Sequence, residues 1–221
     1  AYNFADKGKR VVFFSLETDK DTLWGRLMAQ QIRAGLFNQQ ERLIGETNYR
    51  AALALMRQLE AKGTVLDVVD DGEITMDAMR AAIISGRYDV AFIDYLQLIP
   101  LEDYRNPTEA VRHISMTLHR MARSLGVTIV ALSQLTVPED APKNWVPTAD
   151  NLRESRQLKN DADVIFLLYL ANRKIPSGNR RLACVKNKQG PKGGAISLKF
   201  SGLFQLFSEV NDEPAEEQDE T

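Results

Sequence analysis

The chain has 221 residues, of which 44% are hydrophobic and 26% are charged, and its formal net charge is −2. These values are typical of an ordinary globular chain, most simply of one domain. The single cysteine, Cys184, excludes an intramolecular disulfide framework and fits a reducing compartment. The longest unbroken apolar run, 164–171, is far shorter than the ~20 residues of a membrane span, and we expect no membrane partner.

The charge is unevenly distributed along the chain. The last fourteen residues contain seven acids and no base, so residues 1–207 carry a net positive charge. Because the segment 208–221 has almost nothing to bury, it is predicted to be disordered, either as a plain solvated tail or as a partner-binding segment. Residues 1–207 are only mildly basic, and nucleic-acid binding would therefore need a local site.

Strand and helix patterns alternate through the first three quarters of the chain. Apolar runs predict strands, and amphipathic runs with caps predict helices, with Tyr49, Leu53, Met56 and Leu59 facing inward in the second helix. The predicted strands are 11–17, 65–69, 89–94, 127–133 and 163–170, and the predicted helices are 19–32, 46–62, 75–86 and 107–125. The stretches RRLACVK, AISLKF and LFQLF then indicate a terminal antiparallel β set. This order predicts an α/β fold, a mostly parallel sheet with helices on both faces.

Three polar residues stand where predicted strands end: Glu17, Asp94 and Gln134. Ligands of open parallel sheets gather beyond the carboxyl ends of the strands. Asp94 ends a strand with the pattern of burial on both faces, where an unpaired carboxylate is costly, so it needs a cation, a metal or a set of donors. An Asp can hold hydrated Mg²⁺, a Glu can orient and deprotonate water, and a Gln can sense a phosphate oxygen. Each residue taken alone also fits an ordinary polar strand end.

Five stretches occur in a fixed order: FFSLE, IDYLQLI, VALSQL, LRES followed by DADVIF, and VKNKQGPKG. Together they resemble motifs of the RecA-like C-terminal domain of DnaB-type replicative helicases, over residues 1 to about 207. The resemblance implies a RecA-like ATPase core over 1–207 that unwinds DNA in the 5′→3′ direction as it moves along single-stranded DNA. It also implies a homohexamer with a primase and a helicase loader as partners, in the cytoplasm of a bacterium or phage-infected cell.

The same resemblance assigns roles to the three strand-end residues. It implies that Asp94 is the Walker B acid on the Mg²⁺ of bound ATP. It implies that Glu17 is the catalytic glutamate and that Gln134 contacts the γ-phosphate and relays its state toward DNA. The acid at the end of the buried strand would then be matched by a metal–nucleotide complex.

The phosphate-binding loop of the family is not present in these 221 residues. No window matches G-x-x-x-x-G-K-[ST], whose amides cradle phosphates and whose lysine neutralises them. AYNFADKGKR resembles the last turns of the helix that this loop opens. We therefore expect a fragment that begins just downstream of the loop and is inactive by itself.

Two other stretches differ from the family. At the hairpin that reaches a neighbouring subunit's nucleotide, Lys186 keeps its charge and Lys188 stands in place of the finger arginine, as a point charge without a planar fork. A solvated basic turn is the alternative. In the family, the stretch that LRES resembles forms a loop that contacts DNA and is usually followed by a glycine, but this chain has Arg156 at that position. The cations expected to follow a single-stranded backbone without reading bases are Arg153, Arg156 and Lys159, with a surface cluster as the alternative. Glu154 of the LRES stretch is expected to belong to the same DNA-binding site.

Two other functions remain open at this point. A RecA/RadA-type recombinase ATPase shares the expected fold and often uses lysine fingers, but LRES–DADVIF and IDYLQL favour the helicase. A RecA-fold assembly module without a phosphate-binding loop would have no activity at all. The sequence upstream of residue 1 would separate the enzyme from the module.

Overall fold

The computed structural model describes residues 1–33, 46–100, 106–152 and 156–210. They form two compact units. The first, here called the parallel unit, contains residues 1–136, 152–162 and 203–205. The second, here called the antiparallel unit, contains 137–151, 163–202 and the chain from 206 onward. The expectation that residues 1–207 act as a single core stays a prediction.

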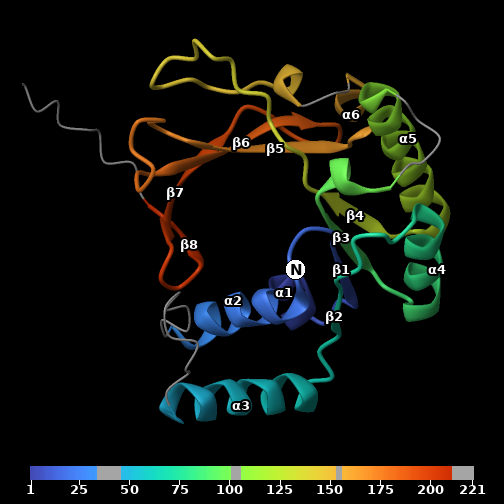
Figure 1. The fold of residues 1–221 in the computed structure, drawn as a ribbon, viewed down its shortest axis with the longest axis vertical. Coiled ribbons are helices and arrows are strands. Elements are labelled where there is room, and N and C mark those ends of the chain that lie inside the picture. Colours follow the sequence, from blue (N-terminus) through green and yellow to red (C-terminus); the bar gives the residue numbers. More distant parts are fainter. Residues whose placement is uncertain (34–45, 101–105, 153–155, 211–221) are drawn as a thin grey trace, which may run out of the picture. The chain divides into compact units, whose positions relative to one another are not determined.

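The parallel unit is built on a four-stranded sheet (Figure 1). All neighbouring strands pair in parallel, in the order β2-β1-β3-β4. The chain leaves β1 on one side to form β2 and returns on the other side to form β3, so the topological switch point lies between β1 and β3. The strands are β1 (Val11–Ser15), β2 (Leu66–Val69), β3 (Val90–Asp94) and β4 (Thr128–Ala131).

Helices form where the sequence supplies caps and apolar faces. Asp19, Thr75 and Asn106 each accept a backbone N–H in the first turn of a helix, as N-cap side chains do. The helix that begins at Asn106 ends at Gly126, whose φ of 66° is the left-handed conformation that glycine adopts without strain. The helices are α1 (Tyr2–Asp6), α2 (Lys20–Ile32), α3 (Glu46–Ala61), α4 (Met76–Gly86), α5 (Pro107–Leu125) and α6 (Arg156–Asp161), with a 3-10 turn η1 (Leu96–Leu98).

The two faces of the parallel sheet are buried against different helices. Alternate strand residues such as Phe14 and Ile93 pack in one apolar cluster with residues of α4 and α5. The intervening residues, among them Val11 and Phe92, pack on the other face with Ala5 of α1. This period of two follows from the strand pleat. It confirms the predicted parallel sheet with helices on both faces.

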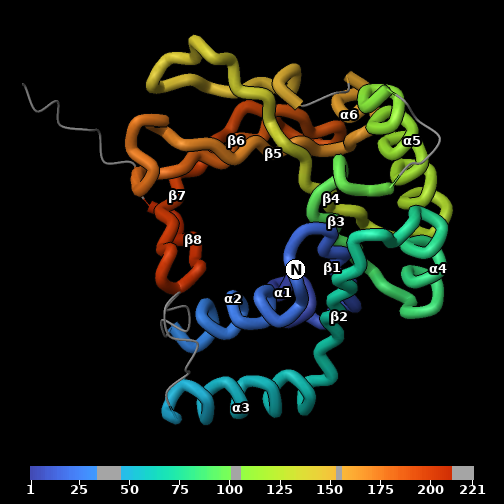
Figure 2. Tube along the Cα trace, viewed as in Figure 1, coloured from blue at the N-terminus to red at the C-terminus, as the bar shows by residue number. Residues whose placement is uncertain are grey.

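Two details of the predicted core are wrong. Tyr49 and Met56 of α3 were expected to face inward, but they are 55% and 49% exposed, and α3, which runs beside α2 (Figure 2), has no fully buried residue. The helical spacing of apolar residues shows which side of a helix is apolar, but it does not show whether another element packs against that side. β4 was expected to be fully buried, but Thr128 and Ala131 are exposed, because β4 pairs with β3 alone among the described strands.

The antiparallel unit is a second four-stranded sheet, in the order β5-β6-β7-β8. Its first strand, β5, was expected to be buried on both faces like the parallel strands, but it pairs antiparallel with β6. Ile165 and Leu167 of this strand are buried, and the residues between and beside them, such as Phe166, are exposed. Cys184 lies in β6 as expected, but it is only half-buried. The strands are β5 (Val164–Leu170), β6 (Arg180–Asn187), β7 (Ala195–Ser201) and β8 (Leu206–Glu209), and a 3-10 turn η2 spans Ala149–Asn151.

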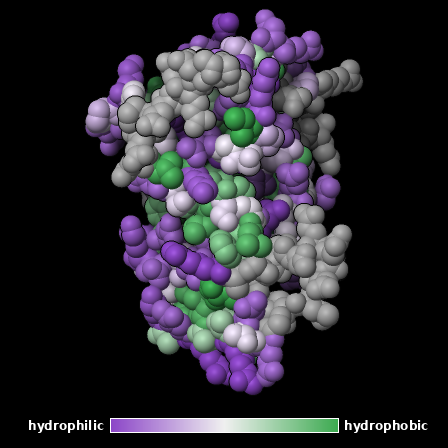
Figure 3. All heavy atoms as spheres, turned by 90° about the vertical axis from the view of Figure 1, so that its left-hand side faces the viewer, coloured by the Kyte–Doolittle hydropathy of each residue, from purple (hydrophilic) through white to green (hydrophobic). Residues whose placement is uncertain are grey.

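Apolar side chains remain on the molecular surface. In the space-filling view, hydrophobic atoms lie between hydrophilic ones on the face that is drawn (Figure 3). Large exposed apolar residues of the chain include Phe166 at 60% and Val146 at 60%. Within the described ranges, no helix combines the length and the apolar composition that crossing a membrane would take.

Candidate functional site

The end of β1 presents Glu17 next to the end of β3. Ser15 pairs with Asp94 across the two strands, and the N–H of Leu16 donates to the carbonyl of Asp94 at 2.9 Å. The buried hydroxyl of Ser15 donates to the carbonyl oxygen of Thr18 at 2.5 Å, which closes a tight turn. Glu17 lies within this turn with its side chain exposed. The local sequence therefore fixes the backbone and leaves the carboxylate facing solvent.

Asp94 is a half-buried carboxylate at the last position of β3. Burial raises its pKa, repulsion by the Glu17 carboxylate raises the pKa further, and the Arg26 guanidinium of α2 acts in the opposite direction. In the part of the chain that the structure describes, no group donates a hydrogen bond to the Asp94 side chain. Two carboxylates thus flank the switch point between β1 and β3, and the positive charge of Arg26 acts on one of them, Asp94.

Gln134 follows β4 at the same edge of the sheet. Main-chain hydrogen bonds join the chain after β4 to β3: the N–H of Leu132 donates to the carbonyl of Ile93, and the N–H of Leu96 donates to the carbonyl of Leu132, both at 3.0 Å. The amide of Gln97 donates to the hydroxyl of Ser133 at 2.9 Å. These hydrogen bonds fix the residues before Gln134, whose own side chain is exposed.

The segment after Gln134 connects this edge to the start of the predicted DNA loop. Leu135 and Leu152 form an isolated antiparallel bridge, so the residue after Gln134 lies beside the residue before 153. Arg153 and Glu154 lie outside the described residues. Arg156 and Lys159 are one helical turn apart on α6, where neighbouring side chains share a face. Asp161 at the end of α6 accepts hydrogen bonds from Ser115 of α5 and from Gln157, each at 2.7 Å.

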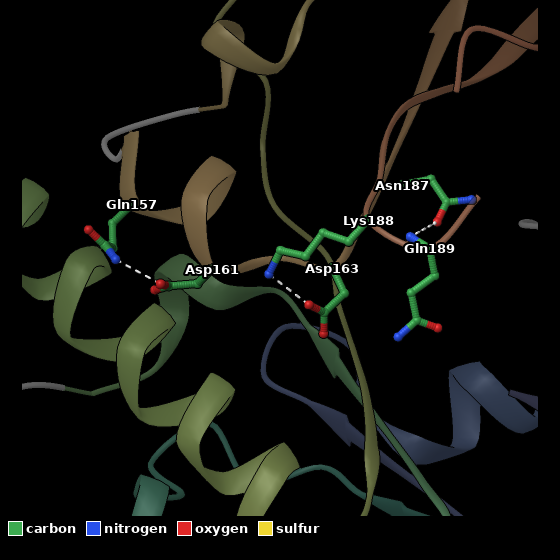
Figure 4. Close-up of polar contacts among 6 residues, drawn as sticks. All are labelled: Gln157, Asp161, Asp163, Asn187, Lys188 and Gln189. Carbon is green, nitrogen blue, oxygen red and sulfur yellow. Dashed lines mark hydrogen bonds and ion pairs between the residues drawn. The ribbon is translucent and has the colours of Figure 1, made fainter. Parts of the chain in front are cut away.

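Lys186 and Lys188 belong to the antiparallel unit. Lys186 lies near the end of β6, opposite Ile165 of β5, and is half-buried. Lys188 follows β6 in the turn toward β7 and forms an ion pair with Asp163, with 2.7 Å between Nζ and Oδ1 (Figure 4). Both lysines therefore lie where the hairpin was predicted, and the partner of Lys188 is an acid of the same chain.

The sequence analysis did not single out some residues of the site. Arg26 acts on Asp94 electrostatically, although nothing in its helical spacing singles it out. Ser15, Gln97 and Ser133 hold the strand ends, and their only sequence signal is that they fall inside the stretches FFSLE, IDYLQLI and VALSQL. The Oε1 atom of Gln97 is buried and has no hydrogen-bond donor among the described residues.

The residues at the switch point fit a nucleotide-bound divalent cation better than a protein-only metal site. The described residues contain no group of three or more His, Cys, Asp or Glu side chains that could hold a metal ion. Mg²⁺ in nucleotide sites is held by one or two carboxylates, with phosphate and water completing its shell. Asp94, which accepts no side-chain hydrogen bond from the described residues, and the neighbouring Glu17 match that requirement.

Comparison with protein families decides the relationship. The family model described as DnaB-like helicase C terminal domain matches residues 1–209. The chain belongs to this family. A probable plasmid replicative DNA helicase of Chlamydia trachomatis is 32% identical over 213 residues, which are 91% of this chain and 44% of that protein. The replicative DNA helicase DnaB of Haemophilus influenzae is 26% identical over 220 residues, covering 91% of this chain and 45% of that protein.

Solved structures agree with this DnaB-like assignment. A DnaB-like replicative helicase whose structure was described with its interactions with primase superposes with a TM-score of 0.79 at 26% identity. The match covers 95% of this chain and 54% of that one. It confirms the predicted RecA-like class of the fold. The DnaB-like chain spans less than half the length of the curated relatives named above.

Proposed function

We propose that this chain is the motor domain of an ATP-dependent, ring-forming replicative helicase that unwinds DNA in the 5′→3′ direction. The observation that supports it best is the half-buried Asp94 at the switch point of a parallel sheet, next to Glu17 and without a donor among the described residues. A half-buried carboxylate without a partner is costly, and a cation that arrives together with a ligand would offset that cost. The named relatives are replicative DNA helicases, and for such an enzyme the ligand that brings the cation would be ATP.

In this proposal each strand-end residue has a separate task. Asp94 holds Mg²⁺ that arrives with ATP, and the cation supplies charge stabilisation at the phosphates. Glu17, exposed on its turn, accepts a proton from the attacking water and orients it. Gln134 contacts the γ-phosphate. Because the G-x-x-x-x-G-K-[ST] loop is absent from these 221 residues, they contribute the metal and water sides of the site and not the phosphate cradle.

In this proposal, the nucleotide site is coupled to the DNA-binding loop through the backbone that follows Gln134. Gln134 precedes Leu135, which bridges to Leu152 at the start of the predicted DNA loop. A displacement of Gln134 on phosphate release would therefore be transmitted through one bridge to Arg153, Arg156 and Lys159. These cations would follow the phosphates of single-stranded DNA without reading bases.

The assembly in this proposal is a homohexamer with ATP between subunits. Lys188 would reach the neighbour's γ-phosphate in trans, with Lys186 as the next candidate. A primase and a helicase loader complete the set of proposed partners. The comparisons do not favour a recombinase or an inactive assembly module, because the named relatives are replicative helicases.

The proposal is tested by unwinding assays on the full-length protein. Asp94→Asn should abolish ATP-dependent 5′→3′ unwinding of a forked duplex, because an amide is a poor ligand for Mg²⁺. Asp89→Asn, at the opposite end of the same strand, is the matched control and should unwind normally, since an amide oxygen still accepts from the N–H of Arg10. Unwinding by Asp94→Asn at the wild-type rate, or none by the wild type, would refute the proposal.

A further inference from the structure

The turn between β6 and β7 has a backbone that its own side chains hold in place. The Oδ1 atom of Asn187 accepts from the N–H of Gln189 at 3.1 Å, and its Nδ2 atom donates to the carbonyl of Pro191 at 3.3 Å. A Cβ atom on Gly190 would lie 2.8 Å from Asn187 Nδ2, so a larger residue here would displace the amide group that holds the turn. The turn therefore presents Lys188 from a fixed backbone.

Lys188 contacts Asp163 twice. Its main-chain N–H donates to the carbonyl oxygen of Asp163 at 2.9 Å, and its Nζ atom lies 2.7 Å from Asp163 Oδ1 (Figure 4). Asp163 immediately precedes β5, and β5 pairs with β6 along its whole length. The acid is thus carried on the strand next to the lysine, and both belong to the antiparallel unit.

The side-chain ion pair is weak enough to be exchanged. The Lys188 and Asp163 side chains are 40% and 68% exposed. Exposed pairs of this kind shift an equilibrium by at most about fivefold, because water screens both charges. A phosphate group with several charged oxygens is a stronger partner for an ammonium than one exposed carboxylate is. The main-chain hydrogen bond does not depend on the side-chain partner and can persist during the exchange.

We propose that Asp163 is a positioning residue that holds the Lys188 side chain in the resting subunit and competes with the phosphates of a neighbour's nucleotide for it. The inference rests on the proposed function, in which Lys188 is the trans finger. Asp163 keeps the flexible four-carbon stem oriented on its rigid turn. It also neutralises the ammonium until a stronger anion arrives, so nucleotide binding includes the replacement of one ion pair by another.

The test is steady-state ATP hydrolysis by full-length rings, whose assembly is first verified by sedimentation. Asp163→Asn keeps the shape of the side chain and removes its charge. It should lower KM for ATP by about two- to fivefold with little change in kcat, because the competing ion pair stabilises the nucleotide-free subunit and is already broken in both the bound state and the transition state. Asp163→Glu should restore a KM near the wild-type value. Glu46→Gln, which removes an exposed ion pair on α3, is the matched control and should change neither constant.

A double-variant comparison separates the two levels of the proposal. Lys188→Ala should impair hydrolysis, and adding Asp163→Asn to it should have no further effect. If Lys188→Ala is impaired but Asp163→Asn leaves KM unchanged, or shifts KM equally without Lys188, Asp163 does not act through the lysine and the inference is wrong. If Lys188→Ala hydrolyses ATP at the wild-type rate, the finger assignment is wrong and the inference fails with it.

Discussion

The hydrogen bond between Ser115 and Asp161 should hold α6, and with it Arg156 and Lys159, against α5. Ser115 is 6% exposed, and its hydroxyl donates to the Asp161 carboxylate at 2.7 Å. A hydrogen bond to a charged group contributes about 1.5–3 kcal/mol to the free energy of unfolding. The lower end applies here, because Asp161 is only half-buried and keeps a second donor, Gln157. Ser115→Ala also gains roughly 0.5 kcal/mol of helix propensity.

The expected net loss is therefore about 1 kcal/mol, or roughly 2–4 °C in Tm for a chain of this size. Far-UV circular dichroism during thermal and urea unfolding measures it, because every α-helix of the described ranges lies in the parallel unit. Ser124→Ala on the same helix is the control: its hydroxyl donates only to the carbonyl of Met121, and its removal should be neutral or slightly stabilising. Equal stabilities of the two variants would refute the reasoning.

Two further predictions concern charge. Asp94→Asn should stabilise the fold at neutral pH, because the raised pKa of Asp94 means that the folded state binds its proton more tightly than the unfolded state does. Wild-type stability should thus fall as pH rises above 3.8, the ordinary pKa of an aspartate, and the stability advantage of the variant should vanish below that pH. Urea titrations at several pH values measure this trend, and its absence would contradict the raised pKa of Asp94. Replacing Arg153, Arg156 and Lys159 with Ala should weaken binding of single-stranded DNA equally for all sequences and lower the slope of log K against log salt by about 0.7 for each phosphate that is no longer neutralised. An unchanged slope would place the DNA on another surface.

The sequence predicted the parallel unit well because the signals there are local. The run from Val11 to Ser15 and the run from Val90 to Asp94 are apolar until their last residue, and a polar residue stands at or just after the end of each. Parallel strands carry their ends to one edge, so the proximity of Glu17 and Asp94 followed from strand assignment alone. Asp19 and Asn106 were readable as caps for the same reason.

Other features depend on tertiary packing that one sequence does not display. The apolar run from Val164 to Leu170 fits a strand of either sheet. Only the structure shows that this strand pairs antiparallel with β6. The exposure of Met56 depends on which element covers α3. The ion pair between Asp163 and Lys188 joins residues 25 positions apart. No local pattern around either residue indicates that the two side chains meet.

The central claim is that Glu17 is the base of an ATP-hydrolysing site that includes Asp94. Its most direct test compares wild type and Glu17→Gln in the full-length protein, with ATP affinity and single-turnover hydrolysis measured on the same samples. Glu17→Gln should bind ATP almost as tightly as wild type and hydrolyse it about 10²–10⁴ times more slowly, because it removes the proton acceptor and leaves the groups that bind the phosphates. The exposed Glu60→Gln on α3 serves as the control. Equal hydrolysis rates for wild type and Glu17→Gln would contradict the claim.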